Sequence, residues 1–256
     1  MPNQPARFVW YELITTDPQA AISFYKAAIG WDAQDFEMAD LTYTILSAGP
    51  ERVGGLMPIP EEARAMGVPP CWTGYIAVDD VDAYVTRVTA AGGALRRAAQ
   101  DIPDVGRFAV VADPHGAVFI LFKGSSDQGP TPAAPDAPGH VGWHELHAGD
   151  LDSAFAFYSG LFGWTKGDAI QTQGGPYQMF SAGGAPIGGM MKKMPQTPGP
   201  FWLYYFIVDE IDAAMKRVTD GGGQNILGPL QVPGGIWIAN CVDPQGAMFA
   251  ISGPKR

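Results

Sequence analysis

The stretch from Phe8 to Trp31, FVWYELITTDPQAAISFYKAAIGW, decides the fold because the chain repeats it. It aligns without a gap to the stretch from Val141 to Trp164, VGWHELHAGDLDSAFAFYSGLFGW, and nine of the 24 positions are identical. The offset of 133 residues is the length of a domain rather than of one supersecondary unit. The sequence therefore predicts a duplicated domain.

Later landmarks recur at a nearly constant spacing, which indicates only small loop insertions between the two copies. The pairs are Gly54-Gly55 with Gly188-Gly189, Trp72 with Trp202, Val78-Asp79 with Val208-Asp209, and Asp113-Pro114-x-Gly116 with Asp243-Pro244-x-Gly246.

The segment 124–139, GSSDQGPTPAAPDAPG, divides the copies. It has four prolines and no aromatic or branched aliphatic residue, a composition typical of an extended connector. We therefore expect one domain over residues 1–123, a linker over 124–139 and a second domain over 140–256.

Composition limits the classes of function. Of the 256 residues, 46% are hydrophobic and 16% are charged, so each half can bury its own core without a metal or a disulfide. A net charge of −10 repels phosphate backbones and anionic lipid, so neither nucleic acid nor a membrane is an expected partner. We expect a neutral or cationic small molecule instead.

The two cysteines and the N-terminus indicate an ordinary intracellular protein. Cys71 and Cys241 fall at non-equivalent points of the repeats and inside strand-like runs, which favours free buried thiols over a disulfide framework. The chain has neither a leader-like N-terminus nor a long uninterrupted apolar run, so the expected location is the cytoplasm.

Each half divides again into two units with the pattern strand, helix and three strands. In the first unit we expect strands over 8–15, 32–36, 42–48 and 52–58, with a helix that follows Asp17-Pro18 and ends at Gly30. The second has strands over 72–78, 94–100, 106–112 and 117–123, with a helix over 81–91. Four such βαβββ units predict an α+β fold in which each half forms a cupped mixed sheet with helices outside.

The repeated motifs resemble a known family. Asp17 with Phe24-Tyr25 and Gly30-Trp31, their second copies, and the two late Asp-Pro-x-Gly turns are similar to the vicinal oxygen chelate superfamily. That superfamily includes glyoxalase I, extradiol dioxygenases and bleomycin-resistance proteins, and the resemblance covers nearly the whole chain outside the linker. It implies a site in the concavity of each sheet, but the scaffold carries many chemistries.

The resemblance also implies where metal ligands would stand. The positions that align with them hold Trp10, Thr73 and Ile120 in the first half, and Trp143, Leu203 and Ala250 in the second. Indole and alkyl groups cannot donate an electron pair to a divalent metal, and the hydroxyl of Thr73 is a weak ligand. We therefore expect neither a metal nor another cofactor. A metal site relocated around Glu145 and His147 remains an alternative.

If the metal-ligand positions implied by the resemblance face the cups, strand alternation predicts which other side chains do so, because residues two apart share one face of a strand. The resulting pocket is apolar and aromatic with one repeated carboxylate. Its predicted ligand-binding residues are Trp10, Trp143, Thr73, Tyr75, Tyr205, Leu203, Ile120 and Met248, and its candidate catalytic residues are Glu145, His147 and Glu12. The two tryptophans either stack on a planar ligand or fill the space of a lost metal site.

Glu12 and Glu145 are the most informative of these residues. A buried carboxylate is costly unless it is paired, hydrogen-bonded or neutralised, and this one occurs in both copies. The glutamates either accept hydrogen bonds that fix the sheet, with Tyr75 and Tyr205 as candidate donors, or act as a base or counter-ion. His147 adds a possible acid–base partner in the second half alone.

Three further histidines favour structural roles. We expect His144 to be a hydrogen-bonded core residue, His115 a solvated turn residue and His140 an exposed residue at the end of the linker.

The resulting hypothesis is a tandem protein of the glyoxalase and bleomycin-resistance kind without the usual metal triad. It binds or transforms a small, partly apolar organic molecule, either as a binding module or as an enzyme in which Glu145 moves a proton next to a carbonyl. A scaffold with degenerate pockets is the third possibility. The halves are expected to pair within one chain about a pseudo-two-fold axis, as a monomer or in a homodimer.

Overall fold

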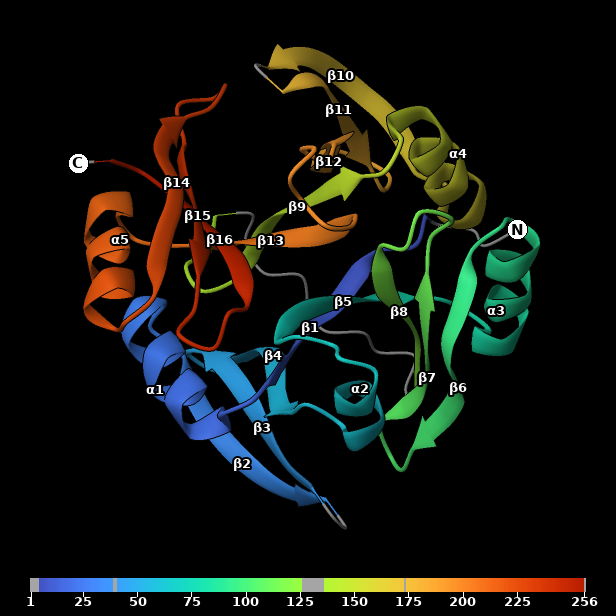
Figure 1. Ribbon diagram of the computed structural model, residues 1–256, viewed down its shortest axis with the longest axis horizontal. Coiled ribbons are helices and arrows are strands. Elements are labelled where there is room, and N and C mark those ends of the chain that lie inside the picture. Colours follow the sequence, from blue (N-terminus) through green and yellow to red (C-terminus); the bar gives the residue numbers. More distant parts are fainter. Residues whose placement is uncertain (1–4, 39–40, 126–135, 173, 256) are drawn as a thin grey trace. The chain divides into compact units, whose positions relative to one another are not determined.

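The computed structural model describes residues 5–38, 41–125, 136–172 and 174–255. Each repeat contributes one eight-stranded mixed sheet with its helices, and the predicted α+β fold with four βαβββ modules is confirmed (Figure 1). The linker predicted over 124–139 lies mostly outside the described residues.

The first repeat follows the expected order of elements. It contains β1 (Phe8–Thr15), α1 (Pro18–Ala28), β2 (Asp32–Met38), β3 (Leu41–Ala48), β4 (Glu51–Pro58), α2 (Glu61–Ala65), β5 (Cys71–Ala77), α3 (Val81–Ala90), β6 (Ala94–Ile102), β7 (Gly106–Ala112) and β8 (Val118–Gly124). The short helix α2 is the one element in this list that the sequence did not predict.

The second repeat has the same order without the counterpart of α2. It contains β9 (Val141–Ala148), α4 (Leu151–Phe162), β10 (Thr165–Thr172), β11 (Gly175–Ser181), β12 (Pro186–Lys192), β13 (Phe201–Ile207), α5 (Ile211–Asp220), β14 (Gln224–Gln231), β15 (Trp237–Val242) and β16 (Met248–Gly253).

The two sheets have the same strand order. It is β2-β3-β4-β1-β5-β8-β7-β6 in the first and β10-β11-β12-β9-β13-β16-β15-β14 in the second. Within each module the last three strands are antiparallel, and the strand that precedes the helix runs parallel to the last of them, as β1 does to β4 with Glu12 beside Gly55. This register decides which side chains meet Glu12.

Local capping explains where the first helix of each repeat begins and ends. The side chain of Asp17 accepts a hydrogen bond from Ala20 N, and that of Asp150 accepts one from Ser153 N, which satisfies exposed helix N–H groups. Gly163 ends α4 with φ at 70°, a left-handed conformation that favours glycine.

The compact units of the chain do not coincide with its two halves. One unit, called here unit 1, comprises Met1–Val9, Thr73–Pro132 and Trp143–Trp202. The other, unit 2, comprises Trp10–Trp72, Ala133–Gly142 and Leu203–Arg256. Each unit therefore combines a module of one repeat with a module of the other.

A buried hydrogen-bonded chain joins the two repeats inside unit 2. Trp72 Nε1 donates to Tyr25 Oη at 2.8 Å, and Tyr25 Oη donates to Asp243 Oδ2 at 3.1 Å. Burial and the neighbouring carboxylate raise the pKa of Tyr25, so its hydroxyl stays protonated and donates.

Unit 1 contains the equivalent chain with the repeats exchanged. Trp202 Nε1 donates to Tyr158 Oη at 3.0 Å, and Tyr158 Oη donates to Asp113 Oδ2 at 3.3 Å. These two chains explain why the tyrosine, the tryptophan and the Asp-Pro-x-Gly turn recur in the sequence. Both Phe-Tyr pairs of these helices, Phe24-Tyr25 and Phe157-Tyr158, are buried in the core.

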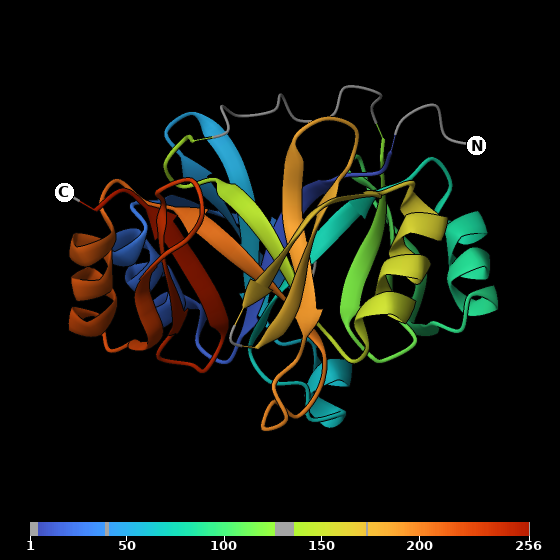
Figure 2. The same ribbon diagram turned by 90° about the horizontal axis from the view of Figure 1, so that it is seen from above.

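Helix pairs within each unit also combine the repeats. Helix α1 packs against α5 in unit 2, and α3 packs against α4 in unit 1 (Figures 1 and 2). Arg217 Nε of α5 donates to the carbonyl oxygen of Ala28 at the end of α1. Arg87 Nη2 of α3 likewise donates to the carbonyl oxygens of Gly160 and Leu161 in α4. Cations at these helix ends complement the negative end of the helix dipole.

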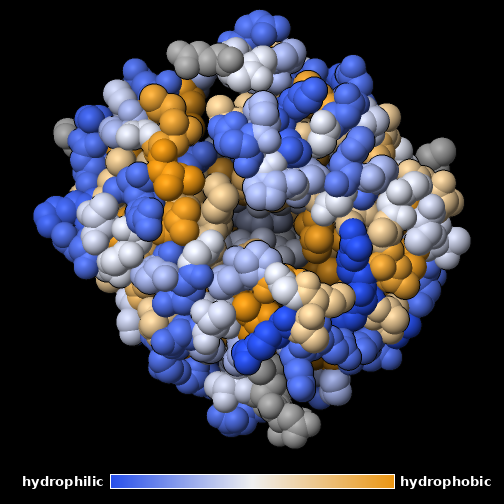
Figure 3. All heavy atoms as spheres, in the orientation of Figure 1, coloured by the Kyte–Doolittle hydropathy of each residue, from blue (hydrophilic) through white to orange (hydrophobic). Residues whose placement is uncertain are grey.

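The described surface is mixed in polarity. An apolar strip lies over edge strand β14, where the side chains of Ile226, Leu227 and Leu230 are exposed (Figure 3). Among the described residues, no helix combines the length and the apolar character that crossing a bilayer requires. Neither cysteine forms a disulfide: Cys241 is buried as expected, whereas Cys71 is half-buried at the start of β5.

Candidate functional site

A hydrogen-bonded triad of one tryptophan, one tyrosine and one glutamate occurs in both repeats. In the first repeat, Trp10 Nε1 donates to Tyr43 Oη at 3.0 Å and Tyr43 Oη donates to Glu12 Oε2 at 3.2 Å. In the second repeat, Trp143, Tyr177 and Glu145 repeat the arrangement, with distances of 2.7 and 3.0 Å. We call these the first-repeat triad and the second-repeat triad.

Glycines in the neighbouring strand make room for the tyrosine rings. A Cβ added at Gly55 would overlap the Tyr43 ring, and one added at Gly189 would overlap the Tyr177 ring. Gly55 lies beside Glu12 in the parallel register, and Gly189 lies beside Glu145. The glycine pairs of the sequence therefore let a tyrosine of the next strand cross over and reach the glutamate.

The triads provide hydrogen bonds to glutamate carboxylates that are largely buried. Glu12 and Glu145 are each 7% exposed. Burial, reinforced by the adjacent carboxylate, raises the pKa of both Tyr43 and Tyr177, so these phenols remain protonated hydrogen-bond donors. Neither tyrosine was singled out from the sequence, because only the register of the sheet brings it beside the glutamate.

A histidine distinguishes the second-repeat triad from the first. His147 Nε2 lies 2.9 Å from Glu145 Oε1, close enough for an ion pair when the imidazole is protonated. This nitrogen has no hydrogen-bond partner of good geometry in the described part of the chain. The imidazole ring stacks on Phe201 at 4.5 Å between centroids and 5° between planes.

The first repeat cannot form the same pair. The residues equivalent to His147 and Phe201 are Ile14 and Cys71. A carboxylate beside an imidazole can exchange a proton with a bound molecule, whereas an isoleucine at that position cannot. Of the two triads, the second-repeat triad alone therefore has an imidazole beside its carboxylate.

The remaining candidate residues divide between the two units. Thr73, Tyr75 and Ile120 belong to unit 1, as Trp143, Glu145 and His147 do, whereas Leu203, Tyr205 and Met248 belong to unit 2 with Trp10 and Glu12. Tyr75 lies beside Ile120 in the register of β5 and β8, and Tyr205 lies beside Ala250 in that of β13 and β16. The suggestion that Tyr75 and Tyr205 donate to the glutamates stays a prediction.

The donor set does not fit a divalent metal at the aligned positions. Both tryptophans use their Nε1 hydrogens within the triads, and an indole offers no lone pair for coordination. Ile120, Leu203 and Ala250 are buried alkyl groups. The described residues also contain no group of three His, Cys, Asp or Glu side chains that could hold a metal ion.

The other histidines have mostly the roles expected of them. His144 is a buried core residue, as predicted: its Nδ1 lies 2.7 Å from the carbonyl oxygen of Ile187 and its ring stacks on Phe8. His115 is exposed in its turn and contacts Ser153. The prediction for His140 is wrong, because its ring is half-buried and contacts Glu51.

Comparison with protein families gives one clear match. The model of the glyoxalase/bleomycin resistance protein/dioxygenase superfamily matches residues 7–121 and 138–251. "Putative glyoxylase CFP32" of Mycobacterium tuberculosis is 37% identical over 248 residues, which cover 96% of this chain and 94% of that protein. "Anthracycline biosynthesis protein DnrV" of Streptomyces peucetius is 30% identical over 262 residues, which cover 98% and 93%.

Solved structures of the same fold are more distant in sequence. The Mn(II)-bound glyoxalase from Novosphingobium aromaticivorans has a TM-score of 0.68 at 16% identity, with 99% of this chain and 83% of that chain covered. The 2,3-dioxygenase LapB from Pseudomonas sp. KL28 also has a TM-score of 0.68, at 12% identity and with 99% and 93% covered. At these identities the likeness concerns the fold alone.

Proposed function

The chain belongs to the glyoxalase/bleomycin resistance protein/dioxygenase superfamily, and we propose that it binds a small, partly apolar organic molecule at its second-repeat triad without a metal ion. The observation that carries this proposal is the contact between His147 and Glu145 at 2.9 Å. It places two titratable groups side by side on one strand, beside aromatic side chains.

The surroundings of this pair favour a ligand with both polar and planar parts. Trp143 is half-buried next to the carboxylate, and Phe201 covers the imidazole ring. Aromatic rings bind planar molecules through contact area, while Glu145 and His147 provide polar anchors. The similarity to a protein named for anthracycline biosynthesis supports an organic ligand of this kind.

A second candidate function, proton transfer next to a carbonyl, is favoured by the same pair. Glu145 can accept a proton from the carbon, and a protonated His147 can donate one to the developing oxyanion. Tyr177 donates to the same carboxylate, so it holds Glu145 in place while the charge changes. The first-repeat triad has the carboxylate and the phenol but lacks the imidazole, and we assign it a structural or binding role.

Matched substitutions in the two triads test the binding function. Small aromatic and carbonyl compounds are screened by ligand-observed NMR against the wild-type protein, Glu145→Gln and Glu12→Gln. We expect compounds whose binding is lost in E145Q and kept in E12Q. The stability of E145Q should change by no more than about 1 kcal/mol, the contribution of one ordinary hydrogen bond. Compounds that bind both variants equally would place the binding outside the triads and contradict the proposal, whereas the absence of any bound compound would argue for a scaffold with degenerate pockets.

The substitution His147→Ile separates binding from proton transfer, because it installs the residue that the first repeat carries at this position. Deuterium exchange next to the carbonyl of a bound compound is followed in D₂O by NMR. For an enzyme, H147I should retain the compound but lose the exchange. Exchange that persists in H147I would contradict the role given to the imidazole.

A further inference from the structure

From Thr73 onward, the strands β5 to β8 belong to unit 1, and they lie side by side in the order β5-β8-β7-β6 (Figure 1). Helix α3 packs against β6, β7 and β8. The ring of Phe119 in β8 contacts three aromatic rings of α4, so this face of the strands is covered by helices. Ile120 and Phe122 alternate with Phe119 and its neighbours and lie on the opposite face, which we call the distal face.

The register of the strands places four side chains in one row across the distal face. Ile120 lies beside Tyr75 of β5 and beside Val110 of β7. Val110 in turn lies beside Arg97 of the edge strand β6. A cationic side chain therefore ends a row that is otherwise apolar and aromatic.

Two phenyl rings extend this row. Phe122 and Phe108 are direct neighbours across β8 and β7. The ring of Tyr75 meets that of Phe122 edge-on, at 5.8 Å between centroids, and Cζ of Arg97 lies 5.4 Å from the centroid of the Phe108 ring. Both phenylalanines are half-buried, so the distal face offers aromatic surface that a ligand can contact.

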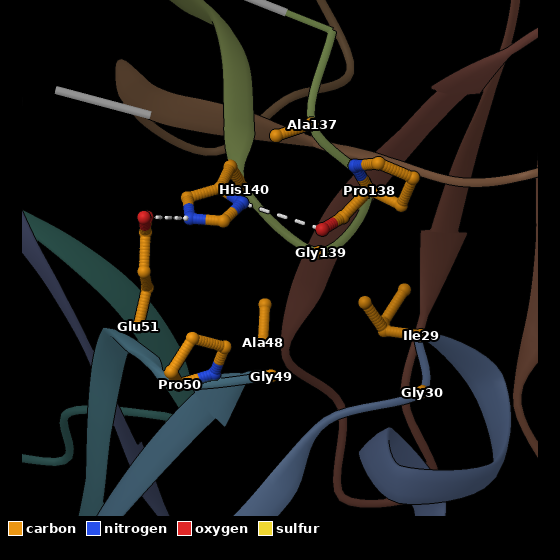
Figure 4. A pocket seen from close by; sticks show the side chains of 10 residues that line it. All are labelled: Ile29, Gly30, Ala48, Gly49, Pro50, Glu51, Ala137, Pro138, Gly139 and His140. Atoms are coloured by element: carbon orange, nitrogen blue, oxygen red, sulfur yellow. Dashed lines mark hydrogen bonds and ion pairs between the residues drawn. The ribbon is translucent and has the colours of Figure 1, made fainter. Parts of the chain in front are cut away.

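The guanidinium of Arg97 makes no ion pair within the described part of the chain, and its Nε is buried there without a hydrogen-bond acceptor. By contrast, Arg107 of the neighbouring strand contacts two aspartates. Glu51, beside a surface cavity of about 450 Å³ in unit 2, likewise contacts His140 (Figure 4). A buried donor without an acceptor is unfavourable, so an oxygen acceptor bound at Arg97 would stabilise this arrangement.

The second repeat folds in the same way without these groups. Its register places Leu227, Ile238 and Ser252 at the positions of Arg97, Phe108 and Phe122, respectively. The fold therefore requires neither the cation nor the two rings, and their presence together in the first repeat points to a ligand.

We propose that the distal face of β5–β8 binds a planar aromatic carboxylate. Arg97 donates its Nε hydrogen and one Nη hydrogen to the two carboxylate oxygens, because a guanidinium presents its N–H groups in a planar fork that matches a carboxylate. Phe108 lies against the guanidinium and helps to hold its plane. The aromatic ring of the ligand packs on Phe108 and Phe122.

The composition of the chain led us to expect a neutral or cationic ligand, since the net charge is −10. At physiological salt, however, exposed charges further apart than about 8 Å are largely screened from each other. The guanidinium that contacts the carboxylate therefore contributes more than distant acidic side chains.

Benzoate is the probe, and neutral benzamide is its matched control because it has the same shape without the charge. Titrations follow the probe by ligand-observed NMR and the Nε–H resonance of Arg97 in isotope-labelled protein. We expect saturable binding of benzoate that shifts this resonance. Benzamide should bind at least about tenfold more weakly, because charge-assisted hydrogen bonds are the stronger ones.

Arg97→Leu copies the residue of the second repeat and should weaken benzoate binding at least about tenfold. Arg96→Leu is its control: it removes the same charge from an exposed neighbour and should bind benzoate as the wild-type protein does. Phe108→Ile, also copied from the second repeat, should weaken binding several-fold through the loss of the ring.

If R97L fails to fold, as judged by circular dichroism, Arg97→Lys decides. It keeps the charge but loses the planar fork, so binding should weaken several-fold. Absence of saturation with the wild-type protein, equal binding of benzamide, or unchanged binding by a folded R97L would each overturn the proposal. Unchanged binding by R97K would overturn it in the same way where R97L does not fold.

The site is independent of the second-repeat triad. His147→Ile should bind benzoate as the wild-type protein does. Loss of benzoate in H147I together with normal binding by R97L would locate the carboxylate at the triad and overturn the assignment to the distal face. Failure of the proposed function would leave the results for Arg97 unchanged.

Discussion

At the scale of single residues, His144 couples stability to pH. Burial lowers the pKa of His144 from 6.5 to about 4, while its hydrogen bond to the Ile187 carbonyl opposes this shift. The unfolded chain therefore binds more protons than the folded one between these two values. The stabilisation is complete above pH 6.5 and is lost as the pH falls through this window, by on the order of 3 kcal/mol.

The substitution His144→Asn tests this coupling, because an asparagine amide can still donate to the Ile187 carbonyl but does not titrate. Urea denaturation of both proteins across the window from neutral pH to about pH 4 measures the free energy of unfolding. The wild-type protein should lose more stability than H144N over this range. Parallel curves would show that His144 is not the titrating group.

Two residue positions also predict how the protein responds to metal. Trp10 and Trp143 stand where the family places ligands, and both direct their indole N–H to a tyrosine. After dialysis against Mn²⁺ or Zn²⁺ and then buffer, elemental analysis should find no stoichiometric metal. One retained metal per chain that disappears in E145Q and H147I would instead support the relocated site around Glu145 and His147.

At the scale of elements, the strand glycines position the triads. Gly189→Ala should push the Tyr177 ring away from Glu145, destabilise the protein by about 2 kcal/mol and weaken any ligand of the triad, because overpacking a tight site forces neighbours to move. The control is Gly160→Ala in α4. The added Cβ would meet no atom within 4 Å, and alanine has a higher helix propensity than glycine, so the free energy of unfolding should rise by up to about 1 kcal/mol.

Chemical denaturation measures the free energy of unfolding of both variants. An unchanged value in G189A would show that the Tyr177 ring can be accommodated beside an alanine.

The elements themselves were largely predictable from the sequence, and the triads were predictable in part. Glu12 and Glu145 were singled out by the ligand positions that the resemblance implies and by alternation along the strand, which depends only on neighbouring residues, and both are buried. Tyr43 and Tyr177 were missed, since they lie two strands away and reach the glutamates only through the sheet register and the glycines between. The short helix α2 was missed because Glu61 to Ala65 bury no side chain and leave no apolar period.

At the scale of the whole molecule, the duplication was predictable but the exchange of modules was not. The motifs containing Tyr25 and Asp243 recur in both repeats, and nothing in the sequence says which copy of one meets which copy of the other. In the structure the tyrosine of each repeat binds the aspartate of the other repeat. The Tyr25–Asp243 pair lies within unit 2 and the Tyr158–Asp113 pair within unit 1. The core of each unit therefore depends on both halves of the chain.

This dependence predicts how fragments of the chain behave. We expect the fragments 1–125 and 136–256, expressed separately, to be far less stable than the whole chain. The first loses the carboxylate that binds Tyr25 and the arginine that binds the end of α1. The second loses the carboxylate that binds Tyr158 and the arginine that binds the end of α4. A buried hydroxyl that loses its partner alone costs about 1–3 kcal/mol, and a carboxylate costs more. Mixing the fragments should restore a one-to-one complex with native near-ultraviolet circular dichroism, detected by size-exclusion chromatography. If the fragments instead fold cooperatively as monomers and do not associate, each repeat has a sufficient core of its own. The buried Tyr25–Asp243 and Tyr158–Asp113 contacts would then not be needed for folding.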